Sequence, residues 1–292
     1  MELELKRGGR TARVETLGGE LVSYRDERGL EYIWGGDPAY WPGRNPLLFP
    51  IVGMLKEGKI RFDGREYAME RHGFARRREF TPAALVEDWV RLELRESAET
   101  LALYPYSFRL AVEQRLTDTG FSTAVTVANP GEGPLPFCLG AHTGFRCPLE
   151  AGERFEDYEL VFPERESCPT LLLRDGLLDR PAALPCLEDT DTLPLDYRWF
   201  DALDTLIFEG LRSRSVALRS RKSGSGVRVS FDGFPMLAFW TMPGKKAPYL
   251  CIEPWHGCAA GTAEGPEFTD KAHCIVLAPG ESRTLAYRAD TL

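Results

Sequence analysis

Apolar and polar residues alternate along several short segments of this chain. In segments 108–116, 125–127 and 227–231, apolar residues recur at every second position over most of the segment, with charged or small polar residues between them. Successive side chains of a strand point to opposite faces of a sheet, so a period of two is typical of strands with one buried face. The pattern predicts a strand in each segment.

Turn signals separate these segments, and helical patterns are rare. Asp63-Gly64 strongly favours a β-hairpin, and the glycine-, serine- and lysine-rich segment 219–226 is predicted to be a second hairpin loop. The only helices we expect are short, near 83–88 and 97–103. Strands that do not alternate with helices exclude a doubly wound parallel sheet. We therefore predict an all-β fold, a large antiparallel β-sandwich, with residues 1–292 forming a single domain.

The composition argues against nucleic acid and membrane as partners. Formal net charge is −8 and the pI is near 5.3, whereas nucleic-acid-binding domains are usually basic. No apolar run approaches the roughly 20 residues of a transmembrane helix, and residues 1–15 lack the apolar core of a secretory signal. The seven cysteines include no Cys-x-x-Cys pair, which suits reduced thiols. We expect a cytoplasmic protein that binds neither nucleic acid nor membrane.

No motif for a common cofactor is present. The chain contains neither a G-x-x-x-x-G-K-[ST] phosphate loop nor a G-x-G-x-x-G dinucleotide fingerprint, and it lacks the G-x-S-x-G turn of serine hydrolases. Its cysteine and histidine spacings match no common zinc site. The chemistry we expect therefore uses no cofactor and no metal.

Polar clusters stand in apolar or glycine-rich surroundings at His72, at His142, at Glu253, and at Asp204 with Asp201 nearby. Taken singly, each has an ordinary structural interpretation: a histidine near glycines is more often structural than catalytic, and a glutamate on a strand usually faces solvent. Taken together, a histidine and a glutamate whose pKa is raised by burial could form an acid–base pair near neutral pH. No conventional nucleophile accompanies them, which favours proton transfer without a covalent intermediate.

Several longer motifs resemble those of a known family. They are segments 44–53 (RNPLLFPIVG), 72–76 (HGFAR), 104–108 (YPYSF), 140–145 (GAHTGF), 251–255 (CIEPW) and 277–282 (LAPGES). In this order they resemble the aldose 1-epimerase, or galactose mutarotase-like, family, and most of all its bacterial branch with an HGFAR segment. The resemblance implies a large antiparallel β-supersandwich. It also implies cofactor-free interconversion of the α and β anomers of a free aldose.

The resemblance assigns roles to residues of this sequence. Glu253 matches the base that takes the proton of the anomeric hydroxyl, and His142 matches the acid that protonates the ring oxygen. His72 matches a second histidine, which binds the sugar near the ring oxygen. The substrate-binding aspartate is best matched by Asp204, with Asp201 as its rival.

Further sugar contacts are expected from neighbouring residues. His72 and Arg76 should face the ligand from segment 70–80, while the arginines that follow them, Arg77 and Arg78, should be solvated. Arg44 and Trp255 are also expected to bind the sugar. An aromatic face is expected from Trp240, Trp255, Phe74 and Phe145.

The chain departs from the family pattern at Met54. The family usually has an arginine here, which contacts the sugar or steadies the first histidine, and a methionine can do neither by charge. Arg44 or Arg76 could take its place. Milder departures are Thr143, where a proline is common, and His256 after Trp255.

Four functions remain open at this stage. The leading one is an aldose 1-epimerase, acting on a free hexose as monomer or homodimer. A hexose-6-phosphate 1-epimerase would use Arg44, Arg76 and Arg77 as a phosphate clamp. A non-catalytic carbohydrate-binding protein on the same fold is favoured by Met54. A glycoside hydrolase or lyase would need two carboxylates, for which Glu253 and Asp204 are the available pair.

Overall fold

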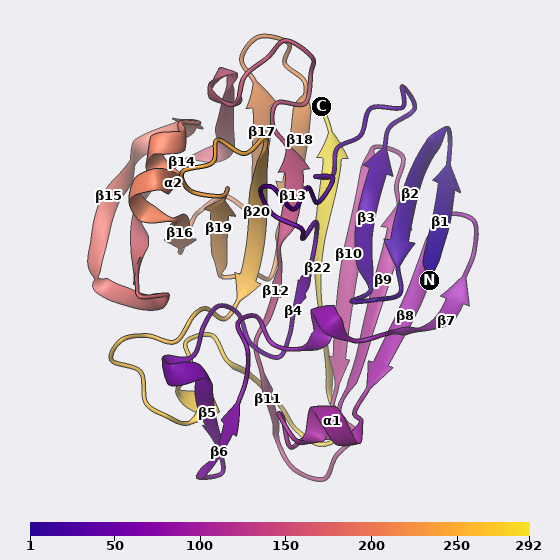
Figure 1. The fold of residues 1–292 in the computed structure, drawn as a ribbon, viewed down its shortest axis with the longest axis vertical. Coiled ribbons are helices and arrows are strands. Elements are labelled where there is room, and N and C mark those ends of the chain that lie inside the picture. Colours follow the sequence, from indigo (N-terminus) through magenta and orange to yellow (C-terminus); the bar gives the residue numbers. More distant parts are fainter.

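The computed structural model describes residues 1–292, and almost all of its regular structure is β (Figure 1). The strands are β1 (Glu2–Arg7), β2 (Arg10–Glu15), β3 (Glu20–Arg25), β4 (Leu47–Leu48), β5 (Lys59–Phe62), β6 (Arg65–Ala68), β7 (Thr81–Leu85), β8 (Trp89–Arg95), β9 (Arg109–Leu116), β10 (Gly120–Ala128), β11 (Leu135–Phe137), β12 (Leu139–Ala141), β13 (Thr143–Arg146), β14 (Tyr158–Arg174), β15 (Leu177–Pro194), β16 (Thr205–Glu209), β17 (Ser215–Ser220), β18 (Gly226–Ser230), β19 (Met236–Trp240), β20 (Tyr249–His256), β21 (Ile275–Leu277) and β22 (Ser282–Thr291). The helices are α1 (Ala98–Leu101) and α2 (Tyr197–Leu203), with short 3-10 turns at Lys56–Gly58, Ala75–Arg77, Phe155–Asp157 and Phe268–Asp270. All pairings between these strands are antiparallel, which confirms the predicted fold class.

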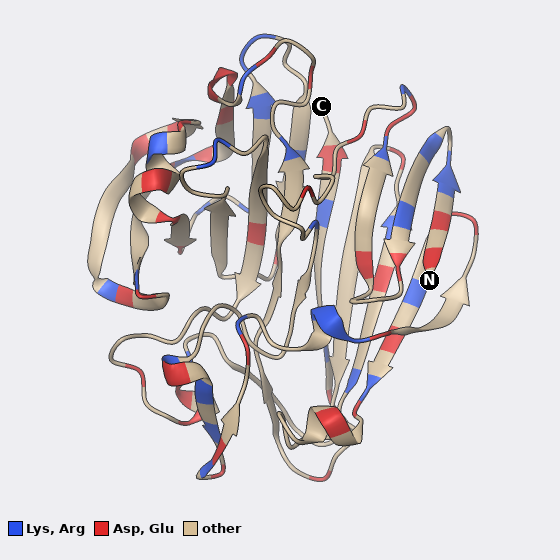
Figure 2. Cartoon of the chain, in the orientation of Figure 1, with Lys and Arg blue, Asp and Glu red and all other residues tan.

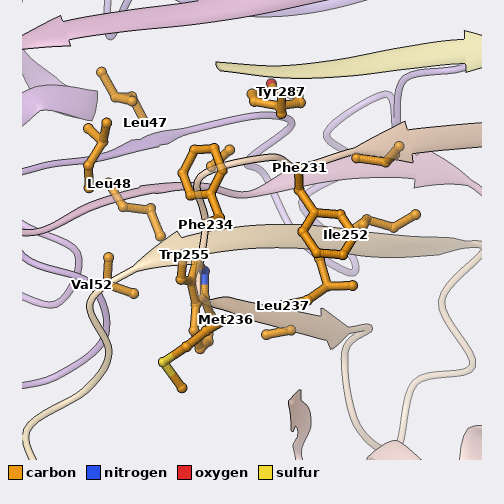
Figure 3. Packing of buried hydrophobic residues seen from close by; sticks show 14 of the residues in the cluster. Leu47, Leu48, Val52, Phe231, Phe234, Met236, Leu237, Ile252, Trp255 and Tyr287 are labelled. Atoms are coloured by element: carbon orange, nitrogen blue, oxygen red, sulfur yellow. The ribbon is translucent and has the colours of Figure 1, made fainter. Parts of the chain in front are cut away.

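One sheet of 15 strands dominates the molecule. Its order is β4-β12-β20-β19-β16-β14-β17-β18-β22-β10-β9-β8-β7, with β13 beside β20 and β15 beside β14. The long strand β14 pairs with β17 near its start and with β16 near its end, so it joins two halves of the sheet. These halves pack face to face: in Figure 3, Ile252 of β20 and Leu237 of β19 lie against Phe231, with Tyr287 of β22 on the opposite side.

The core follows from the alternation seen in the sequence. Strand β10 buries every second residue, and β9 and β18 do nearly the same, which confirms the strands predicted over 108–116, 125–127 and 227–231. The inward side chains belong to one cluster of 70 buried hydrophobic residues. Burial of this apolar surface is the main favourable term in folding.

The outer strands carry charges of both signs. A separate three-stranded sheet, β1-β2-β3, lies beside β9 and β10. Figure 2 shows lysine and arginine interspersed with acidic residues along these strands rather than gathered on one basic face. No helix of the structure is long and apolar enough to span a membrane.

The turn predictions agree with the structure, and the helix predictions agree only in part. Asp63-Gly64 closes the β5–β6 hairpin with positive φ at both residues, and residues 221–225 connect β17 to β18. The helix expected over 97–103 is the single turn α1, capped by Ser97. The helix expected over 83–88 is wrong, because residues 81–85 pair with β8 as an edge strand. So short an isolated helix is marginal, and pairing with a sheet edge outweighs its propensity.

The HGFAR segment is fixed against the chain that precedes β5. His72 and Gly73 both adopt positive φ, at 66° and 70°. The Phe74 and Ala75 N–H groups donate to the Phe49 carbonyl at 3.0 and 3.2 Å. A Cβ on Gly73 would lie 2.2 Å from that carbonyl oxygen, so the contact requires glycine.

Substituting this glycine should therefore be far more costly than substituting a glycine of the same backbone conformation in open space. Gly64 has φ +76°, and a Cβ added to it would meet no heavy atom within 4 Å. Gly64→Ala should cost about 1–2 kcal/mol, the strain of a left-handed alanine. Gly73→Ala should cost at least about 3 kcal/mol, because the 49–53 and 72–75 segments must also separate. Urea unfolding of both variants measures the difference, and equal losses would contradict the packing account.

Candidate active site

The candidate site is built on β20, a strand buried along nearly its whole length. Glu253 lies in its middle and is 1% exposed. On one side β20 pairs with β19, and Ala238 is opposite Glu253. On the other side it pairs with β12 and then β13 in a single register, Gly140 opposite Trp255 and Thr143 opposite Ile252. The same register places His142, between those two strands, opposite Glu253.

Cross-strand neighbours on one face are in direct reach of each other. His142 Nε2 lies 3.3 Å from Glu253 Oε2, without hydrogen-bond geometry. His142 is 8% exposed, and its ring stacks on Trp41 at a centroid distance of 4.9 Å and meets Trp240 edge-on at 5.6 Å. The sequence-predicted acid and base therefore lie together, in an aromatic setting.

Burial shifts both groups toward their neutral forms. It raises the pKa of Glu253 well above its usual value. It lowers the pKa of His142 to about 3. Desolvation always disfavours the charged form, so burial favours a protonated carboxyl beside a neutral imidazole.

Three buried polar atoms at this site have no partner within the protein. They are Glu253 Oε2, His142 Nδ1 and the indole nitrogen of Trp255. Trp255 packs between Val52 and Met236 in the view of Figure 3, so its ring is held firmly. Unpaired buried polar atoms are rare in proteins, and each needs an explanation such as a ligand or water.

The second histidine faces the first. The His72 ring lies 5.6 Å from that of His142, at 89°. Its Nδ1 accepts a hydrogen bond from the Gly53 N–H at 3.1 Å, and the His72 backbone N–H donates to the Gly53 carbonyl at 2.9 Å. Burial, together with the charges of His142, Arg76 and Arg71, holds the pKa of His72 well below 6.5. His72 is therefore neutral, with its proton on Nε2.

These groups line a cavity of about 320 Å³. Small-molecule sites span roughly 300–1,000 Å³, so the cavity suits a single monosaccharide. Its lining residues are Gly53, Met54, Arg71, His72, His142, Leu173, Asp175, Gly176, Leu178, Asp204, Thr205, Ile207, Trp240, Glu253, Trp255, Cys258 and Ala259. His142, Glu253 and Trp255 are buried, whereas Arg71, Asp175 and Asp204 are exposed. The cavity thus has an apolar floor that holds the His142–Glu253 pair, and a charged mouth.

The structure separates the two rival aspartates. Asp204 follows α2 directly, lines the cavity and accepts a hydrogen bond from the Thr205 hydroxyl at 2.7 Å. Asp201 lies outside the cavity lining and accepts from the Gly244 N–H. Of the expected aromatic face, Trp240 and Trp255 line the cavity, whereas Phe74 and Phe145 are core residues.

The arginines expected at the site lie elsewhere. Arg44 pairs with Glu15 and donates to the Gly35 carbonyl, so its expected sugar contact is not supported. Arg76 is half-buried outside the cavity lining and donates to the Arg71 carbonyl at 2.8 Å. The expectation that it faces the ligand is therefore wrong. Arg77, as predicted, is exposed, and it pairs with Glu70.

Sequence reasoning missed the residues at the mouth. Arg71 precedes His72 and was overlooked in favour of the arginines after it. Asp175 and Gly176 form the tip of the long β14–β15 hairpin, both with positive φ. The Asp-Gly dipeptide is the same hairpin signal as at 63–64, and it predicts a turn here. It does not predict that this turn lies at the cavity.

One group of side chains has the composition of a metal site. The ligand atoms of His142, Cys251 and Glu253 lie within 4.8 Å of one another. Burial raises the pKa of the Cys251 thiol well above its usual value, as it does that of the Glu253 carboxyl. Metal ligation requires the thiolate and the carboxylate, so both groups would have to lose protons that burial favours, and the set fits a metal poorly.

Comparisons with known proteins agree with the fold and the motifs. The family model for aldose 1-epimerase matches residues 1–289. The protein named "Protein LacX, plasmid" from Lactococcus lactis subsp. lactis is 40% identical over 295 residues, covering 98% of each chain. A galactose mutarotase related enzyme from Lactobacillus acidophilus superimposes with a TM-score of 0.95 at 27% identity, over 100% of this chain and 97% of that one. A galactose mutarotase-like protein from Lactobacillus casei ATCC 334 gives 0.93 at 27% identity, over 100% of both. This chain belongs to the aldose 1-epimerase family.

Proposed function

We propose that the protein interconverts the α and β anomers of a free hexose by acid–base ring opening, without a cofactor. The observation that carries this proposal is the buried His142–Glu253 pair, with its 3.3 Å separation and its unpartnered polar atoms, at the floor of a monosaccharide-sized cavity. Positioned proton transfer typically contributes about 10²–10⁴-fold to a rate.

In this mechanism the Glu253 carboxylate takes the proton of the anomeric O1–H. The O1–H electrons form the C1=O1 double bond, and the C1–O5 bond breaks. His142, as imidazolium, gives its proton to O5, which becomes the C5 hydroxyl of the open-chain aldehyde. Rotation about C1–C2 presents the other face of the aldehyde, and closure runs the same transfers backward. Both side chains then hold the protons they held at the start.

The pair needs one proton in total for this cycle. Burial alone favours the proton on Glu253. A sugar that hydrogen-bonds both groups solvates the charged forms, so the proton can move to His142 and leave the carboxylate free. His72, neutral and donating through Nε2, can hold the ring oxygen or an adjacent hydroxyl. Trp255 offers its unpartnered N–H to the same ligand.

The arrangement of arginines favours a neutral sugar over a phosphorylated one. The clamp expected from Arg44, Arg76 and Arg77 does not assemble: two of these guanidinium groups pair with Glu15 and Glu70, and the third holds a backbone carbonyl. Two carboxylates, Asp175 and Asp204, lie at the mouth of the cavity and would repel a phosphate.

Removing either member of the pair should abolish anomer exchange. Glu253→Gln and His142→Asn should each lower kcat by at least about 100-fold, because each removes one of the two proton transfers. Proton exchange NMR on glucose, galactose and glucose 6-phosphate, in parallel samples, measures the rate between anomer signals.

Asp201→Asn is the matched control, since this acid lies in α2 but outside the cavity lining, and the variant should exchange anomers at the wild-type rate. Folded Glu253→Gln and His142→Asn proteins that retained wild-type exchange would sink the proposal. A wild-type protein that bound hexose without exchange would favour the carbohydrate-binding alternative.

The raised pKa of Glu253 also predicts a pH-dependent stability difference. Between the unfolded value near 4.5 and the higher folded value, the native carboxyl keeps a proton that the unfolded chain has lost. The contribution of Glu253 to wild-type stability therefore falls as pH rises through this window, by about 1.4 kcal/mol per pH unit. Glu253→Gln does not titrate, so its stability relative to wild type should increase from pH 5 to pH 8.

Urea unfolding of both proteins at several pH values measures this difference. The buried histidines are present in both proteins, so their contributions largely cancel in the comparison. If the stability of Glu253→Gln relative to wild type stayed constant or fell with rising pH, Glu253 would be ionised in the native protein.

A further inference from the structure

Arg71 carries a guanidinium without an acidic partner at the mouth of the cavity. Its neighbours along the segment are paired: Arg77 with Glu70, and Arg78 with Glu99. The one polar contact of the Arg71 side chain is from Nη2 to Met54 Sδ, at 2.7 Å, and no carboxylate oxygen comes within 4.0 Å. A charged group facing a cavity without a protein partner is available to a ligand.

The backbone holds residues 54 and 71 side by side. Gly53 and His72 exchange two hydrogen bonds, one through the imidazole and one through the backbone. A Cβ on Gly53 would lie 2.6 Å from Ala259, so this segment cannot shift outward. The residues that flank this contact, Met54 and Arg71, consequently extend to the same point of the cavity wall, where their side-chain ends touch.

Two further contacts hold Met54 and Arg71 in place. Arg76 donates from Nη2 to the Arg71 carbonyl, which anchors the backbone beneath the free guanidinium. On the other side, the tip of the β14–β15 hairpin lies so close that a Cβ on Gly176 would sit 2.4 Å from Met54 Sδ. Met54 thus fills the space between the hairpin tip and Arg71, and leaves the guanidinium at the mouth.

We propose that Arg71 binds the hydroxyl end of the hexose and supplies the guanidinium that Met54 lacks. The proposal rests on the function proposed above, in which C1 and O5 lie at the floor. The far hydroxyls then reach the mouth, where Arg71 is a donor and Asp175 and Asp204 are acceptors. A sugar hydroxyl both donates and accepts, so this mixed rim matches a neutral sugar.

The test moves the arginine side chain from position 71 to position 54. The proteins are wild type, Arg71→Gln, the double variant Met54→Arg/Arg71→Gln, and the control Arg77→Gln, whose side chain lies outside the cavity lining and pairs with Glu70. The readouts are kcat and KM from NMR exchange with galactose, glucose and glucose 6-phosphate, and Kd for each sugar from the fluorescence of the cavity tryptophans. Arg71→Gln should raise KM and Kd at least about tenfold and change kcat by less than about threefold. The control should match wild type, and the double variant should recover most of the lost affinity.

Several outcomes overturn the inference. An unchanged KM and Kd in a folded Arg71→Gln protein would do so, as would a loss shared equally by Arg77→Gln. A loss much greater for glucose 6-phosphate than for the free hexoses would make Arg71 a phosphate ligand instead. A wild-type protein that binds hexose but does not exchange anomers would refute the proposed function alone, because Kd still reports on Arg71. A wild-type protein that binds no hexose would refute both.

Discussion

The register of β20 with its neighbours is the constraint on which the site depends. Because Gly140 and Thr143 pair with Trp255 and Ile252 in one register, His142 is held opposite Glu253 by backbone hydrogen bonds on both sides of it. A slip of one residue would turn every side chain of a strand to the other face of the sheet. His142 and Glu253 are positioned by the same bonds that build the sandwich, so neither requires a flexible loop.

The same constraint makes the site costly to fold. It forces an ionisable pair into a buried setting, and leaves polar atoms of Glu253, His142 and Trp255 without partners. Each such atom costs roughly 1–3 kcal/mol. The surrounding core of 70 residues offsets the cost and keeps the groups from relaxing toward one another. A sugar would relieve this cost, since its hydroxyls offer the missing donors and acceptors.

The floor of the site could be predicted from the sequence, and the mouth could not. Glu253 and His142 belong to motifs that resemble those of the family, so their roles could be expected from the sequence, although their contact depends on a long-range strand pairing. Arg71, Asp175 and Met54 meet through a hairpin tip that arrives from more than a hundred residues away in sequence. Nothing near Arg71 distinguishes it from Arg76 or Arg77, because the difference lies in what each guanidinium contacts: Arg76 donates to a backbone carbonyl and Arg77 pairs with Glu70. The wrong helix prediction near 83–88 has the same origin, because pairing with β8 at the sheet edge makes residues 81–85 a strand.

This contrast bears on how far roles can be carried over from relatives. On a sheet face, alternation fixes which residues point into a site, so a role belongs to a position in the sequence. Where two loops run side by side, as at 53–54 and 71–72, a side chain from either can place the same group at the same point. A missing arginine at position 54 then does not imply a missing charge in the cavity. Met54 alone therefore gives no reason to infer a protein without catalytic function, because the Arg71 guanidinium lies 2.7 Å from that thioether.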